Sequence, residues 1–168
     1  MASDYQTGSF LRTLASSKPK SNILELGTGT GLSTCWLLDG MCKDSKLTSV
    51  DNDSKYADIA ETCLGKDPRV SFFITDGAAF LSTIRGNKYD LIFADTWPGK
   101  YDGLYTALGL LKKGGIYLID DMLPQKNWPD DHALKVEKLI STLENDRNYL
   151  MAKLSWSTGI IIVTRKHQ

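Results

Sequence analysis

Four apolar runs of this sequence each end at an acidic residue. The acids are Asp51, Asp76, Asp95 and the adjacent pair Asp120 and Asp121. Carboxylates can bind sugar hydroxyls, hold a cation or accept a proton. In an open α/β sheet the ligand lies outside the carboxyl ends of the strands, so these acids would gather at one edge. Any one of them could be a helix cap, but capping is a weaker explanation for all of them together.

The last of these acids predict a cluster. Asp95 and the pair Asp120 and Asp121 are expected to end neighbouring strands. Three carboxylates in one cleft repel each other unless a cation lies among them, and oxygen ligands favour a hard ion such as Mg²⁺ or Ca²⁺. Such an ion could coordinate two neighbouring hydroxyls of a substrate and lower the pKa of one of them. Without a metal, the acids could bind a cationic substrate or act as a base.

A glycine-rich turn precedes these acids in the chain. The apolar residues Ile23, Leu24 and Leu26 predict a buried strand. Gly27, Gly29 and Gly31 predict a tight turn into a helix. Strand, turn and helix together are typical of the phosphate- or nucleoside-binding corner of a doubly wound domain. The dehydrogenase pattern G-x-G-x-x-G fails here, because Leu32 stands where its third glycine would be. A tight turn without a ligand is the alternative.

Residues 25–31, with the sequence ELGTGTG, resemble the first motif of the Rossmann-like S-adenosylmethionine-dependent methyltransferases. The resemblance implies S-adenosylmethionine as the cofactor. The implied cofactor contacts are Glu25, Gly27, Thr28, Gly29, Gly31, Asp51, Asn52, Asp76, Gly77, Ala78 and Asp95. Asp51 lies 24 residues after Gly27, about one βαβ unit, so its carboxylate is expected to bind the ribose hydroxyls.

The later acids resemble those of the metal-dependent O-methyltransferases, the catechol O-methyltransferase group among them. That group has an Asp after the fourth strand and Asp-Asn or Asp-Asp after the fifth, which Asp95, Asp120 and Asp121 match. The resemblance implies that these three acids bind Mg²⁺ or another divalent cation, and that the acceptor is a small molecule with a hydroxyl or an aromatic ring. The group's general base is a lysine three residues after the first Asp. Pro98 stands there, so Lys100 is the candidate base, with Asp95 as the other catalytic residue.

Aromatic residues are expected around the same cleft. Trp97 and Trp128 would line its mouth and could hold a flat acceptor, whereas Trp156 is expected in the core of a terminal hairpin. His132 opens a helix beside Trp128 and is expected at the surface, without a catalytic role.

The elements that position these residues alternate along the chain. Helices are predicted over residues 4–17, 30–42, 54–65 and 78–84, and from near Asp131. Leu104, Leu108 and Leu111 predict a further helix, with lysines at its end and Gly114 as its cap. The strands are predicted over residues 23–26, 46–50, 70–75, 89–94 and 115–119, followed by an antiparallel hairpin of residues 150–156 and 159–164. This pattern resembles an α/β, Rossmann-like doubly wound sheet of seven strands, with order 3-2-1-4-5-7-6, an antiparallel last strand and helices on both faces.

Length and composition narrow the class of protein. The 168 residues predict a single domain, 1–168, and 20 basic against 20 acidic residues give no reason to expect nucleic acid as a partner. Neither a membrane-spanning run nor a signal peptide is predicted. Three cysteines without a C-x-x-C pair are expected as buried thiols, which favours a cytoplasmic location. The helices that cover the substrate in the resembling group are mostly missing, so a homodimer could supply the cover.

Three other functions stay open from the sequence. The first is a metal-independent small-molecule methyltransferase, and the second is a catalytically degenerate nucleoside-binding module that regulates a partner. The third is a nicotinamide oxidoreductase, which Leu32 and the terminal hairpin disfavour.

Overall fold

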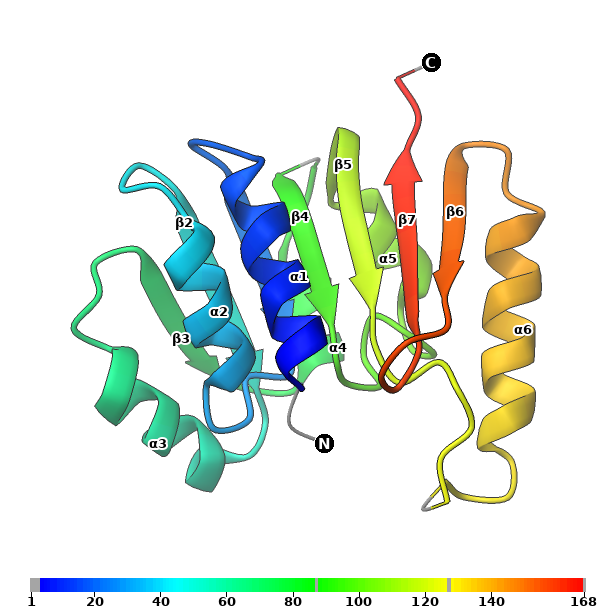
Figure 1. The fold of residues 1–168 in the computed structure, drawn as a ribbon, viewed down its shortest axis with the longest axis horizontal. Coiled ribbons are helices and arrows are strands. Elements are labelled where there is room, and N and C mark those ends of the chain that lie inside the picture. The colour runs from blue at the N-terminus through cyan, green and yellow to red at the C-terminus, as the bar shows by residue number, and fades with distance from the viewer. Residues whose placement is uncertain (1–3, 87, 127, 168) are drawn as a thin grey trace.

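The computed structural model describes residues 4–86, 88–126 and 128–167, and in these ranges seven strands form one sheet. The strand order is β3-β2-β1-β4-β5-β7-β6. The strands are β1 (Asn22–Leu26), β2 (Lys46–Asp51), β3 (Val70–Ile74), β4 (Tyr89–Ala94), β5 (Leu111–Ile119), β6 (Tyr149–Leu154) and β7 (Ile160–Arg165). The first five are parallel and β7 is antiparallel to both of its neighbours, so the predicted sheet is confirmed (Figure 1).

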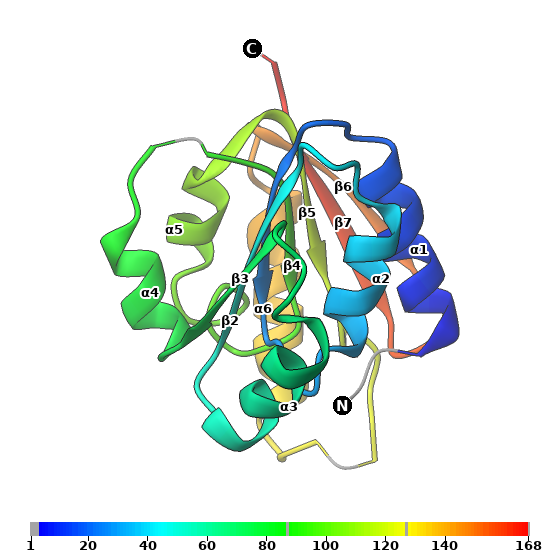
Figure 2. The same cartoon turned by 90° about the vertical axis from the view of Figure 1, so that its left-hand side faces the viewer.

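Helices cover both faces of this sheet, as predicted. They are α1 (Tyr5–Ser16), α2 (Leu32–Gly40), α3 (Ser54–Leu64), α4 (Gly77–Thr83), α5 (Leu104–Gly109) and α6 (His132–Glu144). Figure 2 shows α1 and α2 on one side of the sheet and α4 and α5 on the other. None of the helices in the described ranges combines the length and the apolar character that a membrane crossing requires.

Alternation along the strands builds a core on each face. Leu91 and Phe93 of β4 pack with α1 and α2, whereas Ile92 and Ala94 pack with α5 and α6, and all four are fully buried. Successive side chains of a strand point to opposite faces, so a strand buried on both faces is apolar throughout. This packing fixes the carboxyl ends of β1, β2, β4 and β5 side by side at one edge.

The segment between α5 and β5 differs from the prediction. Leu111 belongs to β5 and pairs with Tyr89 of β4, so it does not continue the preceding helix. Lys112 lies in the strand and forms an ion pair with Asp90 at 2.8 Å. Gly114 has φ +72° inside the strand, beside the register shift between β4 and β5, so it is not a helix cap. Pairing with β4 therefore outweighs the local helical spacing of the leucines.

Two burial predictions are wrong. Cys35 in α2 and Cys63 in α3 are exposed, because the helices turn these positions away from the sheet. Cys42, which follows α2, is half-buried, and all three thiols are free. Trp156 is 37% exposed and packs its ring 5.5 Å from that of Phe10 in α1, so it lies outside the hairpin core.

Candidate functional site

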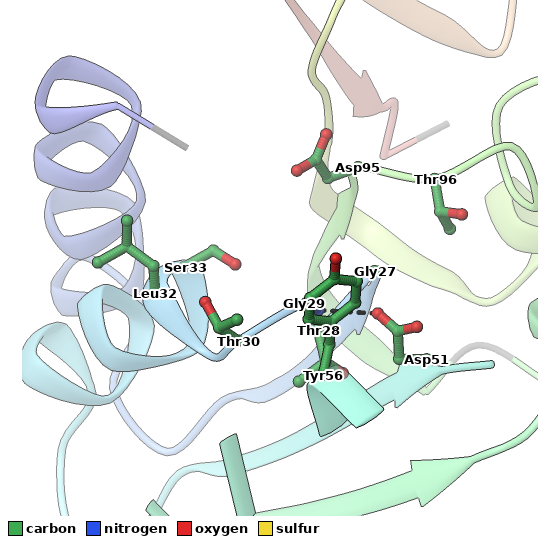
Figure 3. A pocket seen from close by; sticks show the side chains of 10 residues that line it. All are labelled: Gly27, Thr28, Gly29, Thr30, Leu32, Ser33, Asp51, Tyr56, Asp95 and Thr96. Carbon is green, nitrogen blue, oxygen red and sulfur yellow. Dashed lines mark hydrogen bonds between the residues drawn. The ribbon is translucent and has the colours of Figure 1, made fainter. Parts of the chain in front are cut away.

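Three cavities follow one another along the carboxyl edge of the sheet. The central cavity, of about 410 Å³, lies over the glycine turn and is lined by Asp51 and Asp95 (Figure 3). The aromatic cavity, of about 310 Å³, shares Asp95 and Thr96 with it. The β2–β3 cavity, of about 240 Å³, shares Gly27, Asp51 and Thr96 with it. Because neighbouring cavities share lining residues, they form one row across the ends of β2, β1 and β4.

The glycine turn gives the central cavity its floor. Gly27 has φ +102°, and its N–H donates to the Val50 carbonyl at 2.8 Å. A Cβ at this position would lie 3.0 Å from the Asp95 carbonyl oxygen, so the turn requires glycine both for its backbone angle and for its space. Gly27 and Gly29 leave the backbone of the turn open to a ligand in this cavity, which suits the predicted cofactor.

Asp51, at the end of the neighbouring strand β2, stabilises this turn. Its Oδ2 accepts a hydrogen bond of 2.7 Å from the Gly29 N–H (Figure 3). Its Oδ1 accepts one from the Asp53 N–H. The cap of α3 is Asp53, whose side chain accepts from the Lys55 N–H. Asp51 is therefore not the cap of the next helix, and its half-buried carboxylate lines both the central and the β2–β3 cavities.

Glu25 lies beneath the turn. Its Oε2 accepts hydrogen bonds from the hydroxyls of Thr34 in α2 and Ser49 in β2, and the side chain is fully buried. Burial raises the pKa of Glu25, and these hydrogen bonds oppose that rise. Glu25 is not among the described residues that line the three cavities. Its hydrogen bonds instead connect β1 with β2 and α2 below the predicted ligand. Thr28 is also nearly buried, and its hydroxyl bonds to that of Ser49 at 2.6 Å.

The residues after β3 divide between two roles. Asp76 caps α4 by accepting a hydrogen bond of 2.8 Å from the Ala79 N–H, so the capping alternative holds for this acid. Asp76 and Gly77 line the β2–β3 cavity together with Asn52. Ala78 is exposed and is not among the described residues that line that cavity.

Lys100 turns into the molecule. The Trp97 carbonyl accepts from the N–H groups of Lys100 and Tyr101, and Gly99 between them has φ +89°. The hydroxyl of Tyr117, a fully buried residue of β5, donates to the Gly99 carbonyl at 2.8 Å. This turn leaves Lys100 only 4% exposed, so the alternative of a solvated loop lysine is wrong.

The two predicted catalytic residues lie side by side. The Lys100 Nζ is 3.8 Å from the Asp95 Oδ1, and it donates to the Asp120 carbonyl oxygen at 2.7 Å. The Asp95 Oδ1 is buried without a hydrogen-bond partner among the described residues. Burial raises the pKa of Asp95 well above its usual range, Lys100 opposes the rise, and the nearby carboxylates of Asp120 and Asp121 add to it.

The three predicted metal ligands do not form a cation site in the described part of the chain. No group of three His, Cys, Asp or Glu side chains there is placed to hold a metal ion. Asp120 is buried, and its Oδ1 accepts from the Thr158 hydroxyl at 2.5 Å and from the Asp121 N–H at 2.8 Å. Asp121, whose N–H makes the second of these contacts, has a left-handed backbone conformation with φ +59°. The residues present therefore do not fit a divalent ion held by all three carboxylates.

Aromatic rings line the cavity beyond Asp95. Trp97 and Trp128 line it as predicted, and Tyr101 and His132 join them. His132 is 7% exposed, its Nε2 lies 3.0 Å from the Tyr101 hydroxyl, and its ring centroid lies 4.2 Å from that of Trp128. The prediction of a surface histidine is wrong, because the rings of Tyr101 and Trp128 pack against the ring of His132. Burial lowers the pKa of His132, and the charges of Lys100 and Lys135 lower it further.

A family model and several curated relatives match this chain. The family model described as O-methyltransferase matches residues 1–166. Catechol O-methyltransferase of Mycobacterium tuberculosis is 28% identical over 122 residues, which cover 70% of this chain and 56% of that protein. The chain spans about half the length of the curated relatives it matches.

Solved structures share the fold. The O-methyltransferase TomG of Streptomyces achromogenes, solved in complex with S-adenosylmethionine, has a TM-score of 0.85 and 21% identity over 98% of this chain and 82% of that one. The O-methyltransferase of Bacillus cereus, solved in complex with S-adenosylhomocysteine, has a TM-score of 0.83 and 21% identity over 98% of this chain and 83% of that one.

Proposed function

Because this chain belongs to the O-methyltransferase family, we propose that it transfers the methyl group of S-adenosylmethionine to an oxygen of a small molecule. One observation carries the proposal. Asp95 lines both the cavity over the glycine turn and the aromatic cavity, so a cofactor in the first and an acceptor in the second would meet beside its carboxylate.

The cofactor would span two of the three cavities. The turn of Gly27, Thr28, Gly29 and Gly31 would receive the methionine part in the central cavity. Asp51 stands where the central and β2–β3 cavities meet, which suits a carboxylate that binds both ribose hydroxyls. The adenine would then lie in the β2–β3 cavity beside Asn52, Asp76 and Gly77, with Ala78 at its outer border. Glu25 would support this arrangement from below, without touching the ligand.

The acceptor would lie in the aromatic cavity. Rings of Trp97, Tyr101, Trp128 and His132 line a space of about 310 Å³, which suits a flat molecule of one or two rings. Asp95 and Lys100 lie at the inner end of this cavity, so a hydroxyl of the acceptor would point toward them. We therefore propose a small hydroxylated aromatic acceptor.

Asp95 and Lys100 would supply the proton acceptor and the positive charge that the reaction needs. When bound, S-adenosylmethionine supplies an electrophilic methyl group on a sulfonium and is left as S-adenosylhomocysteine. The Asp95 Oδ1, which accepts no hydrogen bond from the described residues, would take the proton of the acceptor hydroxyl. The Lys100 ammonium would stabilise the negative charge that develops on the acceptor oxygen. Lys100 already donates to Asp120, so Asp95 is the better placed of the two predicted bases.

We also propose a location and a set of partners for the protein. A cytoplasmic location is supported by the three free cysteines. A homodimer remains a prediction, as does the absence of nucleic acid and membrane partners. The second candidate function is a nucleoside-binding module without turnover, and only a turnover measurement separates it from the first.

Transfer of a labelled methyl group tests the proposal. The protein would be incubated with methyl-labelled S-adenosylmethionine and a panel of catechols, phenols and hydroxylated heterocycles. We expect a labelled methyl ether, and Asp95→Asn should lower kcat by about 10²-fold or more while S-adenosylhomocysteine still binds. Asp102→Asn, an exposed acid of the same loop, is the matched control and should keep the activity. Cofactor binding without transfer to any acceptor would favour the module without turnover.

A further inference from the structure

A buried positive charge of the chain itself lies in the acid cluster. Lys100 is 4% exposed, and its Nζ contacts the Asp120 carbonyl oxygen at 2.7 Å and lies 3.8 Å from the Asp95 carboxylate. The fold fixes the buried position of Lys100, because the Tyr117 hydroxyl donates to the Gly99 carbonyl and thereby turns the next residue inward. The cluster therefore has a fixed cation without any added ion.

While Lys100 is in place, the oxygens around its ammonium are engaged and are not arranged to hold a divalent ion. Mg²⁺ and Ca²⁺ require several oxygens at about 2.0–2.6 Å in a closed shell. Here the Asp120 Oδ1 is engaged by the Thr158 hydroxyl and the Asp121 N–H. In the described residues no three acidic, histidine or cysteine side chains converge on one point. The ammonium has the Asp120 carbonyl oxygen as its hydrogen-bond acceptor at 2.7 Å and the Asp95 carboxylate as its counter-charge at 3.8 Å.

The charge of Lys100 also acts against an incoming ion. A divalent cation between Asp95 and Asp120 would lie within a few ångströms of the ammonium, in a buried region where like charges repel strongly.

We propose that the Lys100 ammonium takes the place of a divalent cation in the cluster of Asp95 and Asp120, so that this site works without a metal. The inference rests on the proposed function and deepens it, since it concerns how the same site neutralises its carboxylates. Lys100 then performs the electrostatic task of an ion: it balances Asp95 and faces the oxygen of the acceptor.

Binding of Mn²⁺, followed by electron paramagnetic resonance, tests this directly and needs no turnover. Mn²⁺ serves as the probe for a hard divalent ion, with and without S-adenosylhomocysteine. We expect the wild-type protein and Asp95→Asn to bind Mn²⁺ equally weakly. Lys100→Ala removes the ammonium and leaves the carboxylates, so it should bind Mn²⁺ at least about tenfold more tightly than the wild type. Lys100→Arg keeps the charge and is the matched control that should gain no binding.

Two results would overturn the inference. One is a wild-type protein that binds Mn²⁺ tightly and loses this binding in Asp95→Asn. The other is a folded Lys100→Ala variant, checked by its thermal unfolding, that gains no Mn²⁺ binding. The wild-type comparison with Asp95→Asn stands even where Lys100→Ala fails to fold.

A failure of the proposed function would give a different combination of Mn²⁺ binding and methyl transfer from a failure of this inference. A protein that binds no Mn²⁺ and also methylates no acceptor would overturn the methyl transfer and leave the role of Lys100 supported. Transfer that survives removal of metal by a chelator would support both.

Discussion

The hydroxyl of Tyr117 donates a hydrogen bond of 2.8 Å to the carbonyl of Gly99, from a side chain with no exposed surface. Its ring belongs to the core beneath β5, and its single polar atom reaches the loop that follows β4. Gly99 has φ +89°, and a Cβ there would lie 2.6 Å from Leu26, so the turn is held by both space and hydrogen bonding. The core thereby sets the direction of Lys100.

Tyr117→Phe is expected to remove this bond and leave the Gly99 carbonyl without its donor. The loss should cost about 1–2 kcal/mol of unfolding free energy, measured by denaturant titration. It should also lower kcat with little change in the affinity for S-adenosylhomocysteine, because Lys100 is displaced but the glycine turn is not. Tyr105→Phe, with a largely exposed hydroxyl, is the control. Wild-type stability and kcat in Tyr117→Phe would contradict the positioning role.

Asp51→Ala is expected to weaken binding of S-adenosylhomocysteine by about 1.5–3 kcal/mol, the scale of hydrogen bonds to a charged group. The carboxylate is lost both as a ribose ligand and as the acceptor of the Gly29 N–H. Calorimetry measures this change directly. Asp53→Asn, two residues away and still able to cap α3, should bind as the wild type does. Unchanged affinity in Asp51→Ala would remove Asp51 from the cofactor site.

Glu25 should make stability depend on pH. Its pKa is raised in the folded protein by burial, so the unfolded chain loses this proton first as the pH rises. The free energy of unfolding therefore falls as the pH rises from about 4, the ordinary value of a glutamate, through the folded pKa. Asp95, whose pKa burial also raises, adds a fall of the same sign.

Glu25→Gln cannot ionise and should show a shallower fall in denaturant titrations between about pH 4 and pH 8. Glu61→Gln changes an exposed glutamate of α3 and should keep the wild-type slope. An identical slope in Glu25→Gln and the wild type would mean that Glu25 is not the group responsible.

His132→Ala is expected to raise the acceptor KM about two- to tenfold, because one ring of the aromatic cavity is lost. The affinity for S-adenosylhomocysteine should stay the same, since His132 lies beyond Asp95 from the glycine turn. Initial rates over a range of acceptor concentrations separate the two constants. His167→Ala, at an exposed position near the end of the chain, is the control. A change in cofactor affinity without a change in acceptor KM would place His132 in a different role.

Topology made the strand-end acids predictable. Once residues 23–26 and 89–94 are read as neighbouring parallel strands, Gly27 and Asp95 must follow at the same edge, and the structure has Asp95 directly beside the glycine turn. Asp51 follows from the same argument, because β2 pairs with β1 on the other side.

Contacts distant in the chain were not predictable in this way. Lys100 turns inward because of Tyr117, 17 residues later, and no local pattern announces that hydrogen bond. His132 is buried because Trp128 and Tyr101 close over it, although its place at a helix start is typical of the surface. Leu111 fits a helical face, yet its pairing with Tyr89 makes it a strand residue.

A calorimetric titration of S-adenosylhomocysteine into the wild-type protein, with NAD as the comparison ligand, tests the cofactor site most directly. We expect one binding site per chain with a Kd on the order of micromolar, and no heat from NAD. No binding of S-adenosylhomocysteine, or binding of NAD in its place, would contradict the assignment of the glycine turn and Asp51 to a methyl donor.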